Sequence, residues 1–306
     1  MDRLKNILVA VDFSEGSKVA LAQGARIAGW SGATLHVCHV IESLVLHELS
    51  EHMPGTDEEV EADILSDARK HLEAWVADAG SAPKNVQLSV EVGAPIDQLI
   101  RKVVAVSAEL LVLGERGEGH GGSGVGTVAS KAVQKAPTKV LLVAAAHDGA
   151  FEKVVACLDF SDTAREALAQ AAEVAKHDGA LLHMLHTFRG PWTILHYQAP
   201  TPEASPDFQL QYTTALESRL EACRDELIEK HPGLQVECVL RQTAASYGRA
   251  IVAYAKDEDA DLVVLGAQGR TNLRYVFLGS TAERVLRETD CSVLVLKPAG
   301  FSIDTD

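Results

Sequence analysis

The chain repeats itself, and this repeat limits the possible folds more than any other feature of the sequence. Four segments recur in the same order: 5–14 with 152–161, 32–40 with 179–187, 109–117 with 261–269, and 138–143 with 291–296. A chain of 306 residues has room for two domains of about 150 residues each. We therefore expect one domain over residues 1–146 and a second over 150–306, joined by a short linker.

Short apolar runs alternate with longer amphipathic runs in both halves. The apolar runs are rich in Val, Leu and Ile and lack polar alternation, which is typical of strands buried on both faces. Ser14 and Ser161 are placed to cap the first helix of each half. Alternation of strands and helices predicts an α/β fold with a parallel sheet covered on both sides. The expected strands are 6–12, 33–40, 86–92, 109–114 and 139–144, then 153–159, 180–187, 234–240, 261–266 and 292–297.

The bulk composition argues against several classes of protein. The sequence has 28 Lys and Arg against 43 Asp and Glu, a formal net charge of −15. Such a surface repels nucleic acid, although backbone N–H groups can still hold a single nucleotide. The five cysteines form no CxxC pair and favour free thiols in a reducing cytoplasm. No apolar stretch approaches the length of a membrane span, so we expect a cytoplasmic protein without membrane insertion.

A glycine-rich loop in the second half carries the strongest chemical signal. Two residues separate Gly266 from Gly269, nine more precede Gly279, and Ser280 and Thr281 follow. Glycines let a backbone approach a phosphate closely, and a helix that begins near Gly279 would direct its N–H groups at an anion. Arg270 adds positive charge.

The expected topology places an acidic residue beside this loop. If the strand order is 3-2-1-4-5, the chain reverses direction between the first and fourth strands, and ligands bind at such a switch point. Asp159 ends the first strand of the second half, and Gly266 ends the fourth. A carboxylate there suits a ribose hydroxyl or a phosphate-bound Mg²⁺.

The loop and Asp159 together resemble the signature of ATP-binding universal stress proteins, and the resemblance covers the whole chain twice, as in tandem E-type members. It implies two adenine nucleotide alpha hydrolase-like domains, each an open parallel five-stranded sheet of order 3-2-1-4-5 with helices on both faces. It also implies ATP and Mg²⁺ as cofactors. By similarity Asp159 contacts ribose or metal, Thr187 contacts adenine through its main chain, and the phosphates are held by Gly266, Gly269, Gly279, Ser280 and Thr281.

The first half departs from this pattern. Only eight residues separate Gly117 from Gly126, and Glu115 and Glu118 bring negative charge to the loop. A weaker second site is expected here. Its residues are Asp12, Val40, Gly114, Gly117, Gly126 and Thr127.

The resemblance implies an ATP-binding regulatory module for stress adaptation, and two other functions stay open. One is a slow ATPase, although no base or water-orienting residue stands out in the sequence. The other is a binding protein for a lipid or metabolite in the first domain. The sequence names neither the stress nor the partner.

The last strand of each half is apolar and lies at a sheet edge in the inferred order. An exposed apolar edge invites aggregation unless it is covered. Related single domains commonly dimerise through this edge. We therefore expect residues 140–144 and 293–297 to pair, so that the two domains form a pseudo-dimer within one chain. A homodimer of whole chains is also possible.

Overall fold

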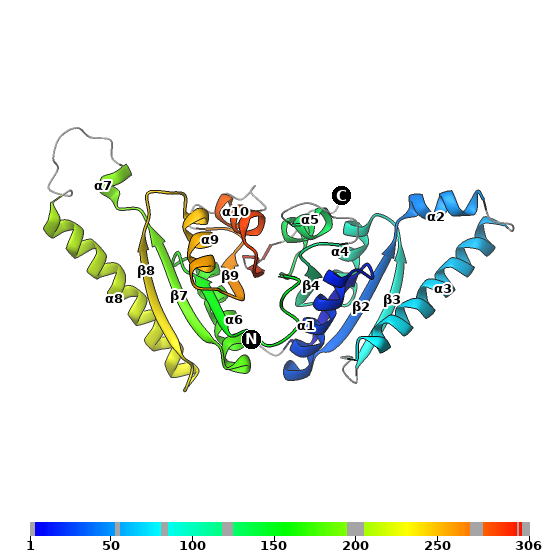
Figure 1. Cartoon of the computed structure of the whole chain (residues 1–306), viewed down its shortest axis with the longest axis horizontal. Helices are drawn as coiled ribbons and strands as arrows, with labels where there is room; N and C mark the ends of the chain where they lie inside the picture. The colour runs from blue at the N-terminus through cyan, green and yellow to red at the C-terminus, as the bar shows by residue number, and fades with distance from the viewer. Residues whose placement is uncertain are drawn as a thin grey trace. The chain divides into compact units, whose positions relative to one another are not determined.

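The computed structural model describes residues 4–52, 56–80, 85–117, 125–194, 205–269, 278–298 and 300–301. The chain divides into two compact units, one of Met1–Gly149 with Ser292–Asp306 and one of Ala150–Cys291. Every expected strand is present, with ends shifted by at most two residues. Figure 1 shows the order of the elements along the chain.

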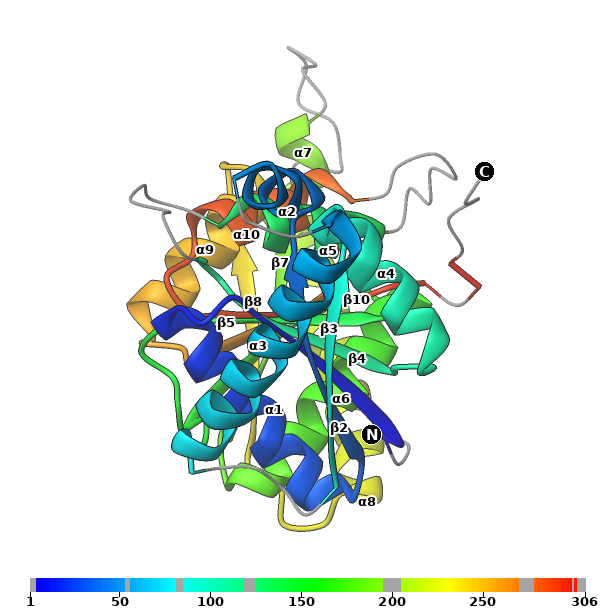
Figure 2. The same cartoon turned by 90° about the vertical axis from the view of Figure 1, so that its right-hand side faces the viewer.

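The first unit is built from alternating strands and helices. Strands β1, β2, β3, β4 and β5 lie in the order β3-β2-β1-β4-β5 and are all parallel. Helices α1 and α3 lie on one side of these strands, and α4 and α5 lie on the other (Figure 2). The elements are β1 (Asn6–Val11), α1 (Glu15–Ser31), β2 (Thr34–Ile41), α2 (Ser43–Ser50), α3 (Asp57–Asp78), β3 (Val86–Val92), α4 (Pro95–Ala105), β4 (Leu110–Gly114), α5 (Thr127–Lys135) and β5 (Lys139–Val143).

The second half repeats this plan. Its strands follow the order β8-β7-β6-β9-β10, so the expected order 3-2-1-4-5 is confirmed in both halves. The elements are β6 (Lys153–Cys157), α6 (Asp162–Asp178), β7 (Leu181–Phe188), α7 (Pro191–Ile194), α8 (Pro206–Lys230), β8 (Val236–Gln242), α9 (Tyr247–Asp257), β9 (Leu262–Gly266), α10 (Ser280–Glu288) and β10 (Ser292–Leu296). The four prolines of segment 189–206 predict a surface loop or lid there. The segment contains α7, and its residues 195–204 lie outside the described residues.

Capping side chains start both first helices where the sequence predicts. The Oγ atoms of Ser14 and Ser161 accept hydrogen bonds from Ser17 N and Ala164 N at 3.2 Å each. Both helices end at glycines with positive φ, Gly32 at 75° and Gly179 at 69°, a conformation that favours glycine. The same start and stop signals thus bound the same helix in each repeat.

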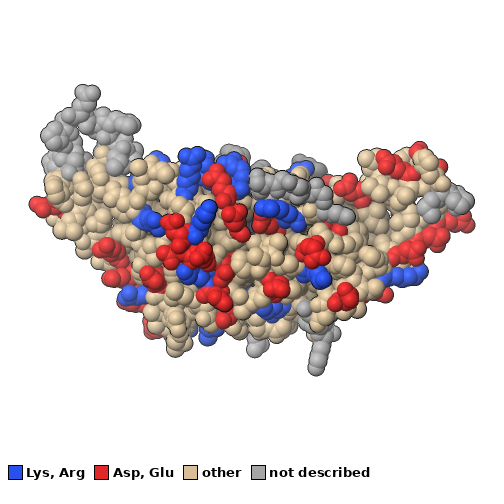
Figure 3. Space-filling view, viewed as in Figure 1, with Lys and Arg blue, Asp and Glu red and all other residues tan. Residues whose placement is uncertain are grey.

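Charged side chains follow the solvent-facing side of α3. Glu58, Glu59, Glu61 and Asp63 in its first turns are exposed, and a row of acidic groups is visible over this helix in Figure 3. Elsewhere on the same face, acidic and basic side chains are mixed. The charge of this helix therefore belongs to the surface and leaves the core apolar.

The last strands of the two halves pair with each other, as expected. Strand β10 runs antiparallel to β5, with Val293 opposite Leu142 and Val295 opposite Val140. Leu142 is 1% exposed, and Val293 is 3% exposed. The apolar edge of β5 is thus covered by a strand of the same chain, which removes a surface prone to aggregation.

Replacing Leu142 by Asp tests this pairing. The change buries a carboxylate without a partner and should lower the free energy of unfolding by about 3 kcal/mol or more. Urea denaturation measures the loss. Leu49→Asp is the matched control, because Leu49 is 42% exposed on α2 and surface changes usually stay within about 0.5 kcal/mol. Equal losses in the two variants would contradict the burial of the β5–β10 edge.

A lysine just beyond β10 caps a helix of the first unit. The Lys297 ammonium donates to the carbonyl of Val133 and, at 3.0 Å, to that of Gln134, both in the last turn of α5. A cation suits the negative end of a helix, and the Phe301 ring lies 4.4 Å away. Burial nevertheless lowers the pKa of Lys297 to about 8.

This lowered pKa predicts a pH-dependent stability. Between pH 8 and 10.5 the unfolded chain holds a proton on Lys297 that the folded chain has lost, so the free energy of unfolding should rise with pH across this window. Denaturation of the unaltered chain and of Lys297→Met at several pH values isolates the effect, because the variant lacks this contribution. Lys131→Met is the control, because Lys131 is exposed on α5, the helix that Lys297 caps. Its stability should change with pH as that of the unaltered chain does. A Lys297→Met curve parallel to the unaltered one would rule the effect out.

Candidate functional site

A cavity of about 430 Å³ lies in the second unit where β6 and β9 end. It collects residues that are far apart in the sequence because these strands are neighbours and parallel, with Val154 opposite Leu262. All the described residues predicted for the ATP site of the second half line this cavity: Asp159, Thr187, Gly266, Gly269, Gly279, Ser280 and Thr281. Arg270 lies outside the described residues.

Local hydrogen bonds fix the orientation of the Asp159 carboxylate. Its Oδ1 accepts from the backbone N–H of Ser161 at 3.0 Å and from the Ser161 hydroxyl at 2.6 Å. Asp residues favour such bonds to the backbone two residues further on. The turn that begins α6 therefore holds one carboxylate oxygen, and the other faces the loop at Gly269.

A strained residue and a histidine support this turn. Phe160 has a φ of 64°, which is unusual for a bulky side chain. Its ring packs against His186 with centroids 4.5 Å apart, and Arg219 lies 4.1 Å above it. His186 Nδ1 lies 2.6 Å from the carbonyl oxygen of Leu158. A carbonyl only accepts, so Nδ1 carries the proton. His186 is thus a hydrogen-bonded histidine near the end of its strand.

Gly269, in the described part of the glycine loop, lies against the carboxylate. A Cβ at Gly269 would lie 2.9 Å from Asp159 Oδ2, which is closer than real Cβ contacts. A Cβ at Gly279 would lie 3.3 Å from the carbonyl oxygen of Ala267, which already accepts the Gly279 N–H at 2.7 Å. Glycine at 269 therefore leaves room for the carboxylate, and glycine at 279 leaves room for the Ala267 carbonyl.

Helix α10 begins at this loop without a side-chain cap. Gly279 is its N-cap residue and makes no side-chain hydrogen bond. The N–H groups of the first turn, at Ser280 and Thr281, have no partner within the helix, and the helix dipole makes this end positive. The site therefore presents backbone donors to an anion, as in many phosphate-binding sites.

The structure adds residues that the sequence analysis did not single out. Arg189 lines the cavity, and its Nη2 and Nε donate to the carbonyl of Ala245 at 2.8 Å and 3.1 Å. Its guanidinium carbon lies 5.6 Å from the centroid of the Tyr247 ring. Tyr212 and Phe188 add aromatic wall to the same cavity. Arg189 lies two positions after Thr187, a residue that the sequence already predicts at the site. The repeat alignment could therefore have identified Arg189 as a cavity residue.

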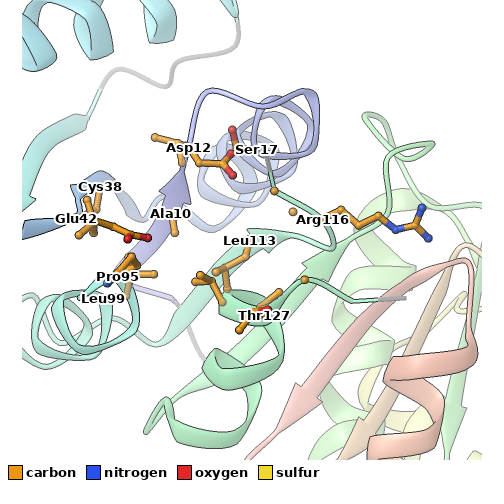
Figure 4. Close-up of a pocket in the computed structure, with 17 residues that line it drawn as sticks. Ala10, Asp12, Ser17, Cys38, Glu42, Pro95, Leu99, Leu113, Arg116 and Thr127 are labelled. Atoms are coloured by element: carbon orange, nitrogen blue, oxygen red, sulfur yellow. The ribbon is translucent and has the colours of Figure 1, made fainter. Parts of the chain in front are cut away.

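The first unit contains an equivalent cavity of about 370 Å³. Figure 4 shows its lining residues. It is lined by every residue predicted for the weaker site: Asp12, Val40, Gly114, Gly117, Gly126 and Thr127. The two repeats thus bring matching sets of residues to matching places.

The supports of the first cavity repeat those of the second. Asp12 Oδ1 accepts from the Ser14 N–H at 3.2 Å and from its hydroxyl at 2.5 Å. Phe13 also has a φ of 64° and packs on His39, whose Nδ1 lies 2.9 Å from the Val11 carbonyl oxygen. A Cβ at Gly117 would lie 2.3 Å from Asp12 Oδ2. The close approach of loop and carboxylate is therefore a property of both repeats.

Two cavity cysteines are unsuited to nucleophilic chemistry. Burial raises the pKa of Cys38 to about 11, against a smaller lowering by the Ser89 hydroxyl. Burial also raises the pKa of Cys157, and nearby Cys291 adds to this shift. Both stay neutral thiols at physiological pH, and the thiolate is the reactive form. All five cysteines are free.

Two other kinds of feature are absent from the described ranges. In that part of the chain, no group of three or more His, Cys, Asp or Glu side chains is arranged to hold a metal ion by itself. Within the same ranges, no helix has the length and apolarity needed to cross a membrane.

The fold and its paired cavities define a tandem α/β protein with one ligand-sized cavity in each repeat. The sequence model of the Universal stress protein family matches the chain twice, over residues 3–144 and 150–297. The chain therefore belongs to the universal stress protein family, with two family domains in tandem.

Individual relatives agree with this assignment. A universal stress protein of Mycolicibacterium smegmatis is 26% identical over 302 residues, which covers 95% of this chain and 97% of the relative. Universal stress protein E of Photorhabdus laumondii is 49% identical, but only over 43 residues, or 14% of each chain. The crystal structure of a universal stress protein from Archaeoglobus fulgidus has a TM-score of 0.62 at 21% identity, covering 95% of this chain and 98% of its own. That likeness concerns the fold.

Proposed function

We propose that the chain is a nucleotide-dependent regulatory module whose second domain binds ATP with Mg²⁺. The observation that carries the proposal is the uncapped start of α10 beside a glycine loop that leaves the Asp159 carboxylate accessible to the cavity. The first-turn N–H groups would hold the phosphates, and Asp159 would contact the ribose or a phosphate-bound Mg²⁺.

The cavity walls support the rest of an adenine nucleotide. Thr187, near the end of β7, lines the cavity and would contact adenine through its main chain. Tyr212, Tyr247 and Phe188 offer aromatic surface for a planar base. Arg189 brings positive charge to a cavity that receives a polyanion.

A regulatory role is favoured over catalysis by the chemistry of the lining. Asp159 is the single carboxylate among the described residues of the second cavity, and Ser161 already binds one of its oxygens. Phosphoryl transfer needs a residue that positions the attacking water or acceptor. ATP would then act as a bound regulatory ligand rather than as a substrate.

Gly279→Leu tests the phosphate cradle. Gly279 has φ −71° and ψ 151°, which any residue adopts, so the variant should fold. The added side chain should obstruct the backbone donors and weaken ATP binding by about tenfold or more, since a hydrogen bond to a charged group contributes roughly 1.5–3 kcal/mol. Isothermal titration calorimetry with Mg²⁺ measures the affinity. Gly149→Leu is the control, because a Cβ at Gly149 meets nothing within 4 Å. Unchanged ATP affinity in Gly279→Leu would falsify the site.

The two domains should bind ATP unequally. The first loop is one residue shorter, and Glu115 within it is only 9% exposed. Calorimetric titration of the whole chain should therefore resolve one stronger site and one weaker site. The Gly279→Leu variant should lose the stronger one and keep the weaker. Two identical, independent sites would contradict this prediction.

A further inference from the structure

The two cavities differ in charge at equivalent positions. The second strand of each half is followed by one charged residue that lines the cavity, Glu42 after β2 and Arg189 after β7. The repeat alignment pairs these positions, since Val40 aligns with Thr187. The sign of the charge at the cavity is thus reversed while the backbone plan is kept.

Glu42 faces the first cavity. It is the N-cap residue of α2 but makes no side-chain capping hydrogen bond. Its carboxylate points inward toward Ala10 and Pro95, as Figure 4 shows. Together with Asp12, it brings two carboxylates to the lining of this cavity.

The described cation of the first cavity does not offset these carboxylates. Arg116 lines the cavity with its backbone and stem, and Figure 4 shows its guanidinium turned away from Asp12 and Glu42. The guanidinium lies 3.1 Å from Glu115 Oε1. Because Glu115 is largely buried, its ion pair with Arg116 keeps the guanidinium away from Asp12 and Glu42.

The uncapped start of α5 does not restore a phosphate site by itself. Gly126 begins this helix without a side-chain hydrogen bond, and a helix N-terminus carries about half of one positive charge. The two carboxylates carry up to two negative charges. The balance at the first cavity therefore opposes a triphosphate, while uncharged hydroxyl or carbonyl groups remain suitable partners for the helix N–H groups.

We propose that the first cavity takes a nucleoside-sized ligand without phosphate groups, and that Glu42 sets this selectivity as Arg189 sets the opposite selectivity in the second cavity. This inference rests on the proposed ATP site of the second domain. The volume of about 370 Å³ falls within the range of small-molecule pockets. The remaining lining is largely apolar and includes Leu99, Leu113 and Val128.

Charge reversal at each position, with ATP and adenosine as probes, tests the proposal. Glu42→Arg should raise the ATP affinity of the first cavity by about tenfold or more, and Arg189→Glu should lower that of the second by a similar factor. Adenosine lacks the phosphates, so its affinity should stay within about threefold in both variants. Calorimetry gives the affinities, and hydrogen exchange at residues 10–17 and 157–164 assigns each binding event to a cavity.

Matched controls carry the same change in net charge away from the cavities. Glu48→Arg alters an exposed position on α2, and Arg249→Glu alters an exposed position on α9. Neither residue lines a cavity, so both controls should bind ATP and adenosine as the unaltered chain does. Control variants that shift ATP affinity as far as the test variants would overturn the role of Glu42 and Arg189.

The outcomes separate the two proposals. Absence of ATP binding in the unaltered chain would reject the nucleotide proposal itself. If ATP binds at the second cavity, but Glu42→Arg leaves the ATP affinity of the first cavity unchanged and Arg189→Glu leaves that of the second unchanged, only the charge assignment is rejected. Adenosine that protects residues 157–164 but never residues 10–17 would overturn the ligand class proposed for the first cavity.

Discussion

The pairing of the first strand with the fourth in each half is the contact on which both cavities depend. Ile7 lies opposite Leu110, and Val154 lies opposite Leu262. Because these strands are parallel, their carboxyl ends reach the same edge and the chain leaves them in diverging directions. The aspartate after one strand and the glycine loop after the other are then forced together. Small loops can contact a carboxylate there without any further domain.

The aspartate turn is held in a costly backbone conformation, and each repeat offsets the cost in the same way. A bulky residue at φ 64° costs on the order of 1–3 kcal/mol. In the second half, Ser161 donates two hydrogen bonds to the Asp159 carboxylate. His186 packs on the ring of the strained phenylalanine and donates to the carbonyl of the residue before Asp159. Phe13 and Phe160 are strained because the turn aims the carboxylate at the loop. Backbone strain of this kind is often associated with functional sites.

Local patterns in the sequence predicted most of the fold and the aspartate and glycines that line each cavity. Strands, serine caps and the aspartate beside the glycines depend on periodicity and on short-range rules, so they were accessible without coordinates. Arg189 follows β7, and Tyr247 begins α9. Neither residue was predicted, because whether they reach the cavity depends on the order of the strands. The positive φ of Phe160 was also inaccessible, since no local rule favours it for phenylalanine. The helix cap by Lys297 depends on the long-range pairing of β10.

Duplication explains why the backbone of the two cavities is so similar while their charges differ. The aspartate turn and the glycine contact are set by main-chain geometry, so a change there would break the turn or block the loop. Glu42 is exposed and makes no side-chain capping hydrogen bond, so its charge can change sign at little cost in stability. Arg189 donates two hydrogen bonds to the Ala245 carbonyl, so a change there also loses those contacts. The ligand preferences of the two domains could therefore diverge through the charged residue that follows the second strand of each half. On this argument the altered loop of the first domain is compatible with retained binding of a different ligand, because its supporting turn is intact.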